Sequence, residues 1–165
     1  ELYLLVSYVM DGFAFAGEAL GGRFIGAQNR TAFDEMLRRL VFWSLLVSLL
    51  FTVVYFFFGH GILTLLTNEQ EVITTAQTYL YGAAFVAITG AAAFILDGIF
   101  IGATATRDML LSVFLSTLLF FLLYFLLRDS LGNHGLWIAY NAYLAFRGVV
   151  LYVRLPHLKS QAFKA

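Results

Sequence analysis

The chain alternates between long apolar stretches and short polar connections. Five apolar stretches occur, each close to or above the roughly 20 residues that an α-helix needs to cross a bilayer. They cover residues 2–27, 40–58, 72–103, 109–127 and 136–155. The third is long enough to be tilted or bent within the membrane. The pattern therefore predicts an all-α integral membrane protein in which one bundle of five transmembrane helices makes up residues 1–165.

Polar residues mark the expected helix ends. The predicted connections are short and cover residues 28–36, 59–71, 104–108 and 128–133. Pro156 is the single proline of the chain. Because proline cannot donate the backbone hydrogen bond of a continuing helix, we expect Pro156 to close the fifth helix.

Composition supports a lipid environment. Hydrophobic residues make up 61% of the 165 residues and charged residues 12%, whereas soluble domains average about 45–50% and about 25%. A soluble domain of this size buries only about 68–70% of its unfolded surface, so much of the excess would face water. This composition argues against a soluble enzyme, a nucleic-acid-binding domain and a disordered segment.

Charge and motif content exclude further classes. Ten basic and ten acidic residues balance, without a basic run that would bind phosphates. The chain contains no cysteine, so it offers no disulfide or thiolate metal site. Its three histidines lack metal-ligand spacing, and no phosphate-binding glycine loop or nucleophile–base arrangement occurs. We therefore expect a protein that is not an enzyme and holds no metal or cofactor.

Basic residues gather at one end of the predicted bundle. Arg128 lies at the opposite end, and Arg147 lies within the fifth stretch. The other eight are Arg23, Arg30, Arg38, Arg39, Arg107, Arg154, Lys159 and Lys164. Because cytoplasmic loops are enriched in Lys and Arg, the bias predicts a cytoplasmic C-terminus. The chain would then begin outside at Glu1 without a preceding signal, which leads us to expect part of a longer polytopic protein.

Four ionisable residues lie inside the apolar stretches: Asp11, Glu18, Asp97 and Arg147. Such residues are costly in a membrane and usually face a cavity or a partner. Asp11 and Glu18 are seven positions apart, so they share one helix face but stand about 10 Å apart along the axis. We interpret them as separate binding stations rather than a pair that shares a proton.

A short internal repeat relates Glu18 to Asp97. Residues 24–27 (Phe-Ile-Gly-Ala) recur at residues 100–103. If the two copies lie at similar depth, Glu18 and Asp97 differ by only about 4–5 Å in depth. They would line one cytoplasmic-side pocket if their helices are neighbours. Such a pocket could take up and release a proton or a monovalent cation.

Structural interpretations of the same residues stay open. Intramembrane carboxylates also pair with arginine or cap kinked helices, and Arg147 could be a counter-ion or a snorkelling group instead of a substrate contact. Arg147 shares a stripe with Tyr140 and Tyr143. Small-xxx-small glycine pairs indicate close helix packing. Phe13 and Phe15 are candidates to line an apolar substrate cavity.

Three motifs resemble the multidrug and toxic compound extrusion (MATE) transporters, most closely the branch named after DNA-damage-inducible protein F (DinF). Residues 11–20 (DGFAFAGEAL), with Gly22, Arg23 and residues 25–27, resemble the eighth transmembrane helix of that family. Residues 96–104 (LDGIFIGAT) resemble its tenth helix, and residues 132–137 (GNHGLW) resemble the entry to its twelfth.

The resemblance implies a fold and an activity. The family has twelve helices in two lobes around a cavity that opens alternately to each side of the membrane. This chain would be helices eight to twelve, most of the C-terminal lobe, with the N-terminal lobe as its partner. The resemblance places Asp97 at the acidic position of the C-terminal lobe that the family associates with cation coupling. Glu18 and Asp11 match branch motifs.

The expected function is export of hydrophobic or cationic compounds across a plasma membrane, as in the bacterial inner membrane, in exchange for H⁺ or Na⁺. Asp97, Glu18 and Asp11 are the expected cation-coupling residues, and Phe13, Phe15, Tyr140, Tyr143 and Arg147 are the expected substrate-cavity residues. Two alternatives stay open. A lipid-linked oligosaccharide flippase of the same superfamily should have a larger basic cavity, whereas a non-transporting assembly module should tolerate replacement of the acids.

Overall fold

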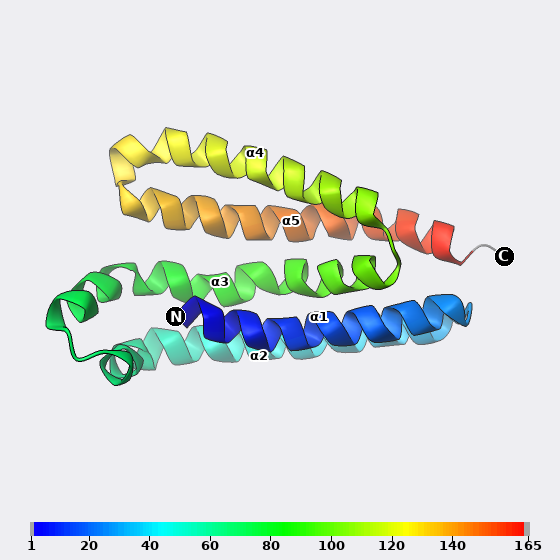
Figure 1. The fold of residues 1–165 in the computed structure, drawn as a ribbon, viewed down its shortest axis with the longest axis horizontal. Helices are drawn as coiled ribbons and strands as arrows, with labels where there is room; N and C mark the ends of the chain where they lie inside the picture. Colours follow the sequence, from blue (N-terminus) through cyan, green and yellow to red (C-terminus); the bar gives the residue numbers. More distant parts are fainter. Residues whose placement is uncertain (1, 164–165) are drawn as a thin grey trace.

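Five α-helices account for nearly all of the computed structural model, which describes residues 2–163 (Figure 1). They are α1 (Leu2–Gly26), α2 (Arg30–Leu66), α3 (Gln70–Gly102), α4 (Thr106–Leu131) and α5 (Asn133–Ala162). Within this part of the chain all five are long and apolar enough to cross a membrane. The predicted fold class is confirmed. Glu1 and Lys164, which entered the topology prediction, lie outside the described residues.

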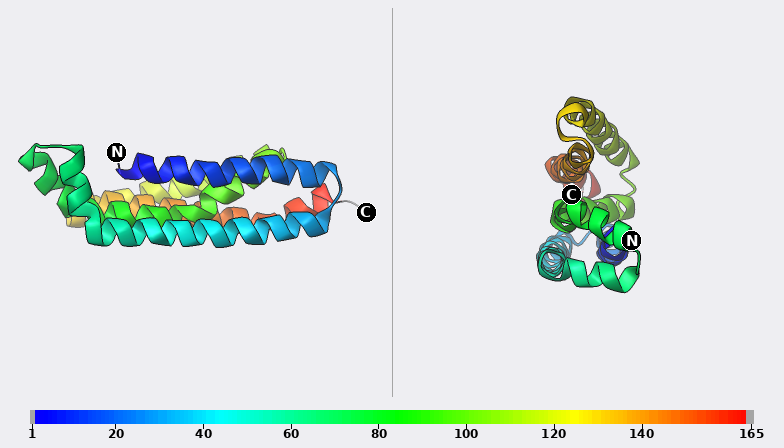
Figure 2. Two further views of the ribbon diagram at one scale, coloured as in Figure 1. Left: turned by 90° about the horizontal axis from the view of Figure 1, so that it is seen from below. Right: turned by 90° about the vertical axis from the view of Figure 1, so that its left-hand side faces the viewer.

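The helices run back and forth in a flattened bundle with α3 at its centre (Figures 1 and 2). The α1–α2 pair packs on one side of α3, and α5, with α4 beyond it, packs on the other. Half of the buried residues of α3 are alanine or glycine, among them Ala84, Ala87, Gly90 and Ala91. Their size lets neighbouring helices approach α3 closely. The outer helices expose many large apolar side chains, as expected of surfaces that face lipid or a further domain.

The helices are longer than their apolar stretches. The segments 28–36 and 59–71 were expected to be connections, but α2 begins at Arg30 and ends at Leu66. Its 37 residues correspond to about 55 Å of helix at the standard rise, more than the hydrocarbon core requires, and Figure 2 shows the end of α2 bent away from the rest of the helix. The polar residues support the helix end: the Asn29 side chain caps the Ala32 N–H at 3.0 Å, and Arg39 pairs with Glu35 one turn earlier.

Pro156 does not end the fifth helix, contrary to the sequence prediction, because α5 continues to Ala162. Pro156 removes one backbone N–H donor from the helix, but the turn that follows it makes contacts with other helices that keep it helical. Leu158 is buried in the core, and Lys159 forms an ion pair of 2.5 Å with Asp34 of α2. These contacts hold the end of α5 against α2.

Glycines bring α1 and α3 into backbone contact. A Cβ added to Gly98 would lie 2.0 Å from the carbonyl oxygen of Ala14, and one added to Gly102 would lie 2.3 Å from that of Glu18. Nothing lies within 4 Å of a Cβ at Gly26. The glycine pair of α3 therefore serves close packing, and it makes the helices that carry Glu18 and Asp97 direct neighbours.

The two Phe-Ile-Gly-Ala copies end their helices in the same way. The residue after each copy has a positive φ, 53° at Gln28 and 54° at Thr104. In each turn the next N–H bonds back to the carbonyl of the phenylalanine, from Asn29 to Phe24 at 3.0 Å and from Ala105 to Phe100 at 2.9 Å. This six-to-one bond is the Schellman helix end. The internal repeat is therefore also a structural repeat.

Candidate functional site

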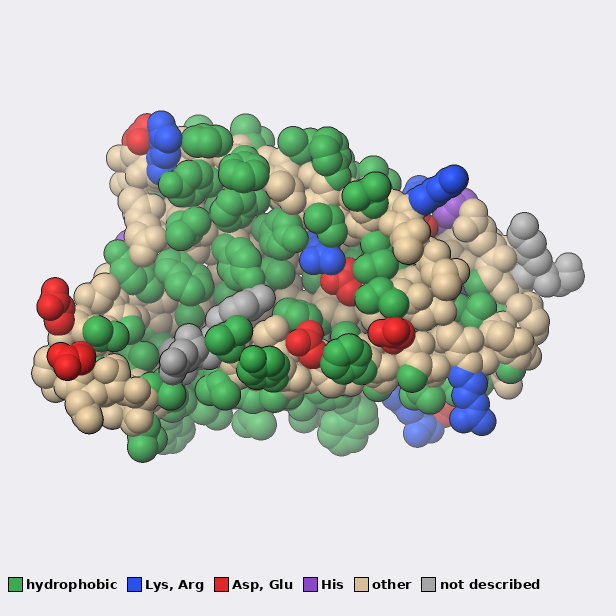
Figure 3. Space-filling model, in the orientation of Figure 1, with side chains coloured by type: hydrophobic (Ala, Val, Ile, Leu, Met, Phe, Trp, Pro, Cys, Tyr) green, Lys and Arg blue, Asp and Glu red, His purple; other side chains and the backbone are tan. Residues whose placement is uncertain are grey.

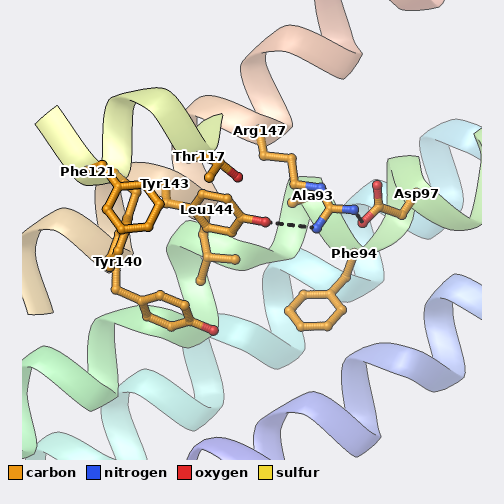
Figure 4. Close-up of a pocket in the computed structure, with 10 residues that line it drawn as sticks. Ala93, Phe94, Asp97, Thr117, Phe121, Tyr140, Tyr143, Leu144 and Arg147 are labelled. Carbon is orange, nitrogen blue, oxygen red and sulfur yellow. Dashed lines mark hydrogen bonds and ion pairs between the residues drawn. The ribbon is translucent and has the colours of Figure 1, made fainter. Parts of the chain in front are cut away.

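A cavity of about 470 Å³ opens between α3, α4 and α5 (Figure 4). Its lining combines aromatic and aliphatic side chains with one acid and one base. The lining residues are Ala93, Phe94, Asp97, Thr117, Phe120, Phe121, Tyr140, Tyr143, Leu144 and Arg147. The size falls within the ~300–1,000 Å³ range of small-molecule sites.

An ion pair joins the charged groups of this cavity. Arg147 Nη2 lies 2.8 Å from Asp97 Oδ2, and the two side chains are 20% and 19% exposed. Arg147 Nη1 also donates a hydrogen bond of 3.4 Å to the hydroxyl of Tyr143, as Figure 4 shows. The counter-ion role that the sequence left open for Arg147 is therefore present, with Asp97 as its partner.

The pair is held by fewer contacts than its groups allow. Among the described residues, Asp97 Oδ1 and Arg147 Nε are both buried without a hydrogen-bond partner. A guanidinium and a carboxylate can form two parallel hydrogen bonds, which is the stronger arrangement. This pair therefore stays partly unsatisfied in an apolar setting, where unmet polar groups are costly.

Glycines next to the two charged residues explain why the charges meet. Gly98 follows Asp97 and packs on α1, which turns the side chain of Asp97 about 100° away, towards α5. Gly148 follows Arg147, and a Cβ added there would lie 2.9 Å from Cβ of Ala92. The close contact of α5 with α3 at this level brings Arg147 within reach of Asp97.

A second polar contact joins the same two helices further along the bundle. The Asn141 amide donates to the carbonyl of Gly82 on α3 at 3.0 Å and to that of Trp137 at 2.9 Å. Its oxygen accepts a hydrogen bond of 2.8 Å from Thr89. Interhelical hydrogen bonds of this kind contribute about 0.6 kcal/mol each on average in membranes. They fix the register of α3 against α5.

Aromatic rings enclose the cavity beside the ion pair. Tyr140 and Tyr143 stack at 6.2 Å between ring centroids, and the ring of Phe120 meets Tyr143 edge-on at 6.4 Å. Sequence reasoning predicted both tyrosines but missed the contribution of α4. Thr117, Phe120 and Phe121 follow the three- and four-residue spacing of one helix face, which was the available signal.

Phe13 and Phe15 do not line the cavity that contains Tyr140, Tyr143 and Arg147. Phe15 is 67% exposed and does not line the cavity, whereas Phe13 lines a separate pocket between α1 and α2 with Trp43. Two residues two positions apart point about 200° away from each other on a helix, so they cannot share one wall.

Glu18 and Asp11 also lie outside the cavity that holds Asp97. Both side chains on α1 are partly exposed, and neither has an ion-pair or hydrogen-bond partner among the described residues. The helices of Glu18 and Asp97 are neighbours, as the prediction required, but Asp97 turns towards α5, so one shared pocket is not formed. Figure 3 shows acidic and basic side chains together in the middle of an otherwise largely hydrophobic face.

Within the described part of the chain, no group of three or more His, Asp or Glu side chains could hold a metal ion. The arrangement is that of a membrane-spanning helical bundle with an aromatic cavity around a charged pair. Such cavities inside a membrane mark substrate and ion pathways. The fold and site together define a polytopic membrane protein with the features of a transporter.

Sequence comparisons identify the family. The sequence model of the MatE family matches residues 2–126, and the chain belongs to this family of MATE transporters. The chain is 37% identical over 150 residues to DNA damage-inducible protein F of Escherichia coli (strain K12). That alignment covers 91% of this chain and 32% of the relative, so the chain spans about a third of the length of the relative. No solved structure matches the chain.

Proposed function

We propose that this chain works as the C-terminal lobe of a secondary multidrug antiporter. It exports hydrophobic, often cationic compounds in exchange for H⁺ or Na⁺, by movement against an N-terminal lobe. The observation that supports this most strongly is the position of Asp97, an acid inside an aromatic cavity at membrane depth. Membership of the MatE family supplies the transport context.

The cavity suits a hydrophobic cation. The carboxylate of Asp97 provides the negative charge that H⁺, Na⁺ or an organic cation needs, and these ligands exclude one another if they share it. Phe94, Phe120 and the stacked tyrosines offer ring faces, which attract cations by about 0.5–2 kcal/mol each. The binding of one cation then displaces the other, which is the basis of exchange.

Glu18 and Asp11 have a supporting role in this proposal. Both carboxylates lie on α1, partly exposed beside the helix that carries Asp97. They attract cations towards Asp97 without forming part of its cavity. A flippase for lipid-linked oligosaccharides is a poorer fit, because the cavity contains one arginine and no lysine.

Asp97→Asn is the test of the proposed exchange site. In membrane vesicles that contain the complete transporter, gradient-driven efflux of a cationic drug should fall at least about tenfold, which corresponds to roughly 1.4 kcal/mol. Glu18→Gln should cause a smaller loss. Asp129→Asn, at an exposed residue of α4, is the matched control and should transport normally. Wild-type efflux by Asp97→Asn at normal expression would reject the proposal.

We also propose that the protein lies in a plasma membrane with the end of α5 in the cytoplasm. Apart from Lys164, the eight basic residues predicted to be cytoplasmic lie at the end of the bundle where α1, α3 and α5 terminate (Figure 1). Because cytoplasmic ends are enriched in Lys and Arg, this end is expected to face the cytoplasm. In the complete protein without other cysteines, Asp129→Cys should react with a membrane-impermeant maleimide in intact cells, and Gln161→Cys only after permeabilisation. The reverse labelling pattern would show that the end of α5 lies outside the cytoplasm.

A further inference from the structure

Arg147 already occupies the place that a bound cation would take. Its Nη2 lies 2.8 Å from Asp97 Oδ2, within direct hydrogen-bonding distance. At that distance in a low-dielectric cavity, the guanidinium neutralises the carboxylate and blocks one of its oxygens. A transported cation therefore meets a site that contains a cation from the protein itself.

The hold of Arg147 on Asp97 is incomplete. Only one nitrogen and one oxygen form the ion pair, while Asp97 Oδ1 and Arg147 Nε have no hydrogen-bond partner within the described range. A two-point arrangement would satisfy all four atoms and hold the arginine more firmly. The observed contact is thus suited to being exchanged for another partner of Asp97.

Arg147 also has a second partner within its own helix. The Tyr143 hydroxyl lies 3.4 Å from Arg147 Nη1, one turn earlier on α5. Tyr140 stacks on Tyr143 in the same wall of the cavity, and both rings have faces that can accept a guanidinium (Figure 4). A displaced Arg147 would therefore keep a polar and aromatic contact instead of being left in lipid.

We propose that Arg147 is a tethered cation that competes with the transported cation for Asp97 and so sets the selectivity of the site. When neither the coupling ion nor a drug is bound, Arg147 neutralises Asp97 and joins α5 to α3. When a hydrophobic cation binds Asp97, Arg147 leaves the carboxylate but keeps its hydrogen bond to Tyr143, and this ionic link between α3 and α5 is released. Weakly binding cations fail to displace Arg147. This inference rests on the proposed cation-binding role of Asp97.

Binding of tetraphenylphosphonium, a permanently charged hydrophobic cation, tests the competition. The complete transporter is purified in detergent and titrated by calorimetry. Arg147→Gln should bind the probe about tenfold more tightly than the wild type, whereas Arg147→Lys, which keeps a competing charge, should stay close to it. Arg128→Gln, at the opposite end from the basic cluster, removes an arginine outside the cavity and is the charge-matched control. The double variant Asp97→Asn/Arg147→Gln should show no gain.

The outcomes separate this inference from the proposed function. Unchanged or weaker binding by Arg147→Gln, together with loss of binding by Asp97→Asn, would overturn the competition but keep Asp97 as the cation site. Wild-type binding by Asp97→Asn would instead reject the proposed function. If Arg147→Gln does not fold, Tyr143→Phe provides the second test. Without the hydroxyl that would hold the displaced guanidinium, Arg147 should stay on Asp97 and weaken probe binding several-fold, and unchanged affinity in that variant would overturn the inference.

Discussion

Gly98→Ala is expected to abolish most of the folded protein in the membrane. The added Cβ would lie 2.0 Å from the Ala14 carbonyl oxygen, and the obstacle is backbone rather than a flexible side chain. Relief requires α1 and α3 to separate along their main contact. Overpacking of cores costs about 1–3 kcal/mol and occasionally more, and this backbone clash belongs at the upper end. The yield and the thermal midpoint of the detergent-purified complete transporter measure the effect.

Gly26→Ala is the matched control for this substitution. It adds the same methyl group to a glycine at the end of α1, where nothing lies within 4 Å of the new atom. We expect wild-type stability from this variant. Equal thermal midpoints for Gly98→Ala and Gly26→Ala would contradict the close contact of α1 and α3.

Asp97→Leu is expected to destabilise the bundle by an amount at the lower end of about 3–5 kcal/mol. The substitution leaves the guanidinium of Arg147 without its carboxylate in a site where the arginine is only 20% exposed. An uncompensated charge in an apolar setting is the main cost. The residual exposure and the Tyr143 hydroxyl reduce it. The thermal midpoint of the purified transporter is again the measurement.

The double variant Asp97→Leu/Arg147→Leu identifies the origin of that cost. It removes both charges, so it should recover most of the stability lost in Asp97→Leu. A double variant that is less stable than the single variant would show that packing, not the unpaired arginine, dominates. The same comparison explains why Asp97→Asn is the better substitution for transport, because its amide still accepts a hydrogen bond from Arg147.

The sequence was sufficient to predict the five helices and part of the site. The helices could be predicted because each apolar stretch approaches the length of a bilayer span. The helix ends could not be predicted, because hydropathy identifies the lipid-facing part of a helix and not the full length over which its backbone is hydrogen-bonded. The end of α5 illustrates this, because Lys159 and Leu158 gain contacts beyond Pro156 that no local pattern contains.

The helical period predicts which residues of one helix share a face, and this part of the site could be predicted. The direction in which that face points depends on how the helix is rotated in the bundle, and this part could not. Tyr140, Tyr143 and Arg147 share a stripe, and the structure places them together with Asp97. Glu18 was expected to share the pocket of Asp97 on depth alone. Depth says nothing about direction, and the packing of Gly98 on α1 turns Asp97 towards α5 instead.

The proposed exchange requires that Asp97 holds the ion that the substrate displaces. The test is ion release by the purified complete transporter when a cationic drug is added. Release of H⁺ is measured as a pH change in weak buffer, and release of Na⁺ with a sodium-selective electrode. We expect the wild type, equilibrated with the coupling ion so that the ion replaces Arg147 on Asp97, to release that ion when the drug binds and Asp97→Asn to release neither. Undiminished ion release from Asp97→Asn would show that Asp97 does not hold this ion.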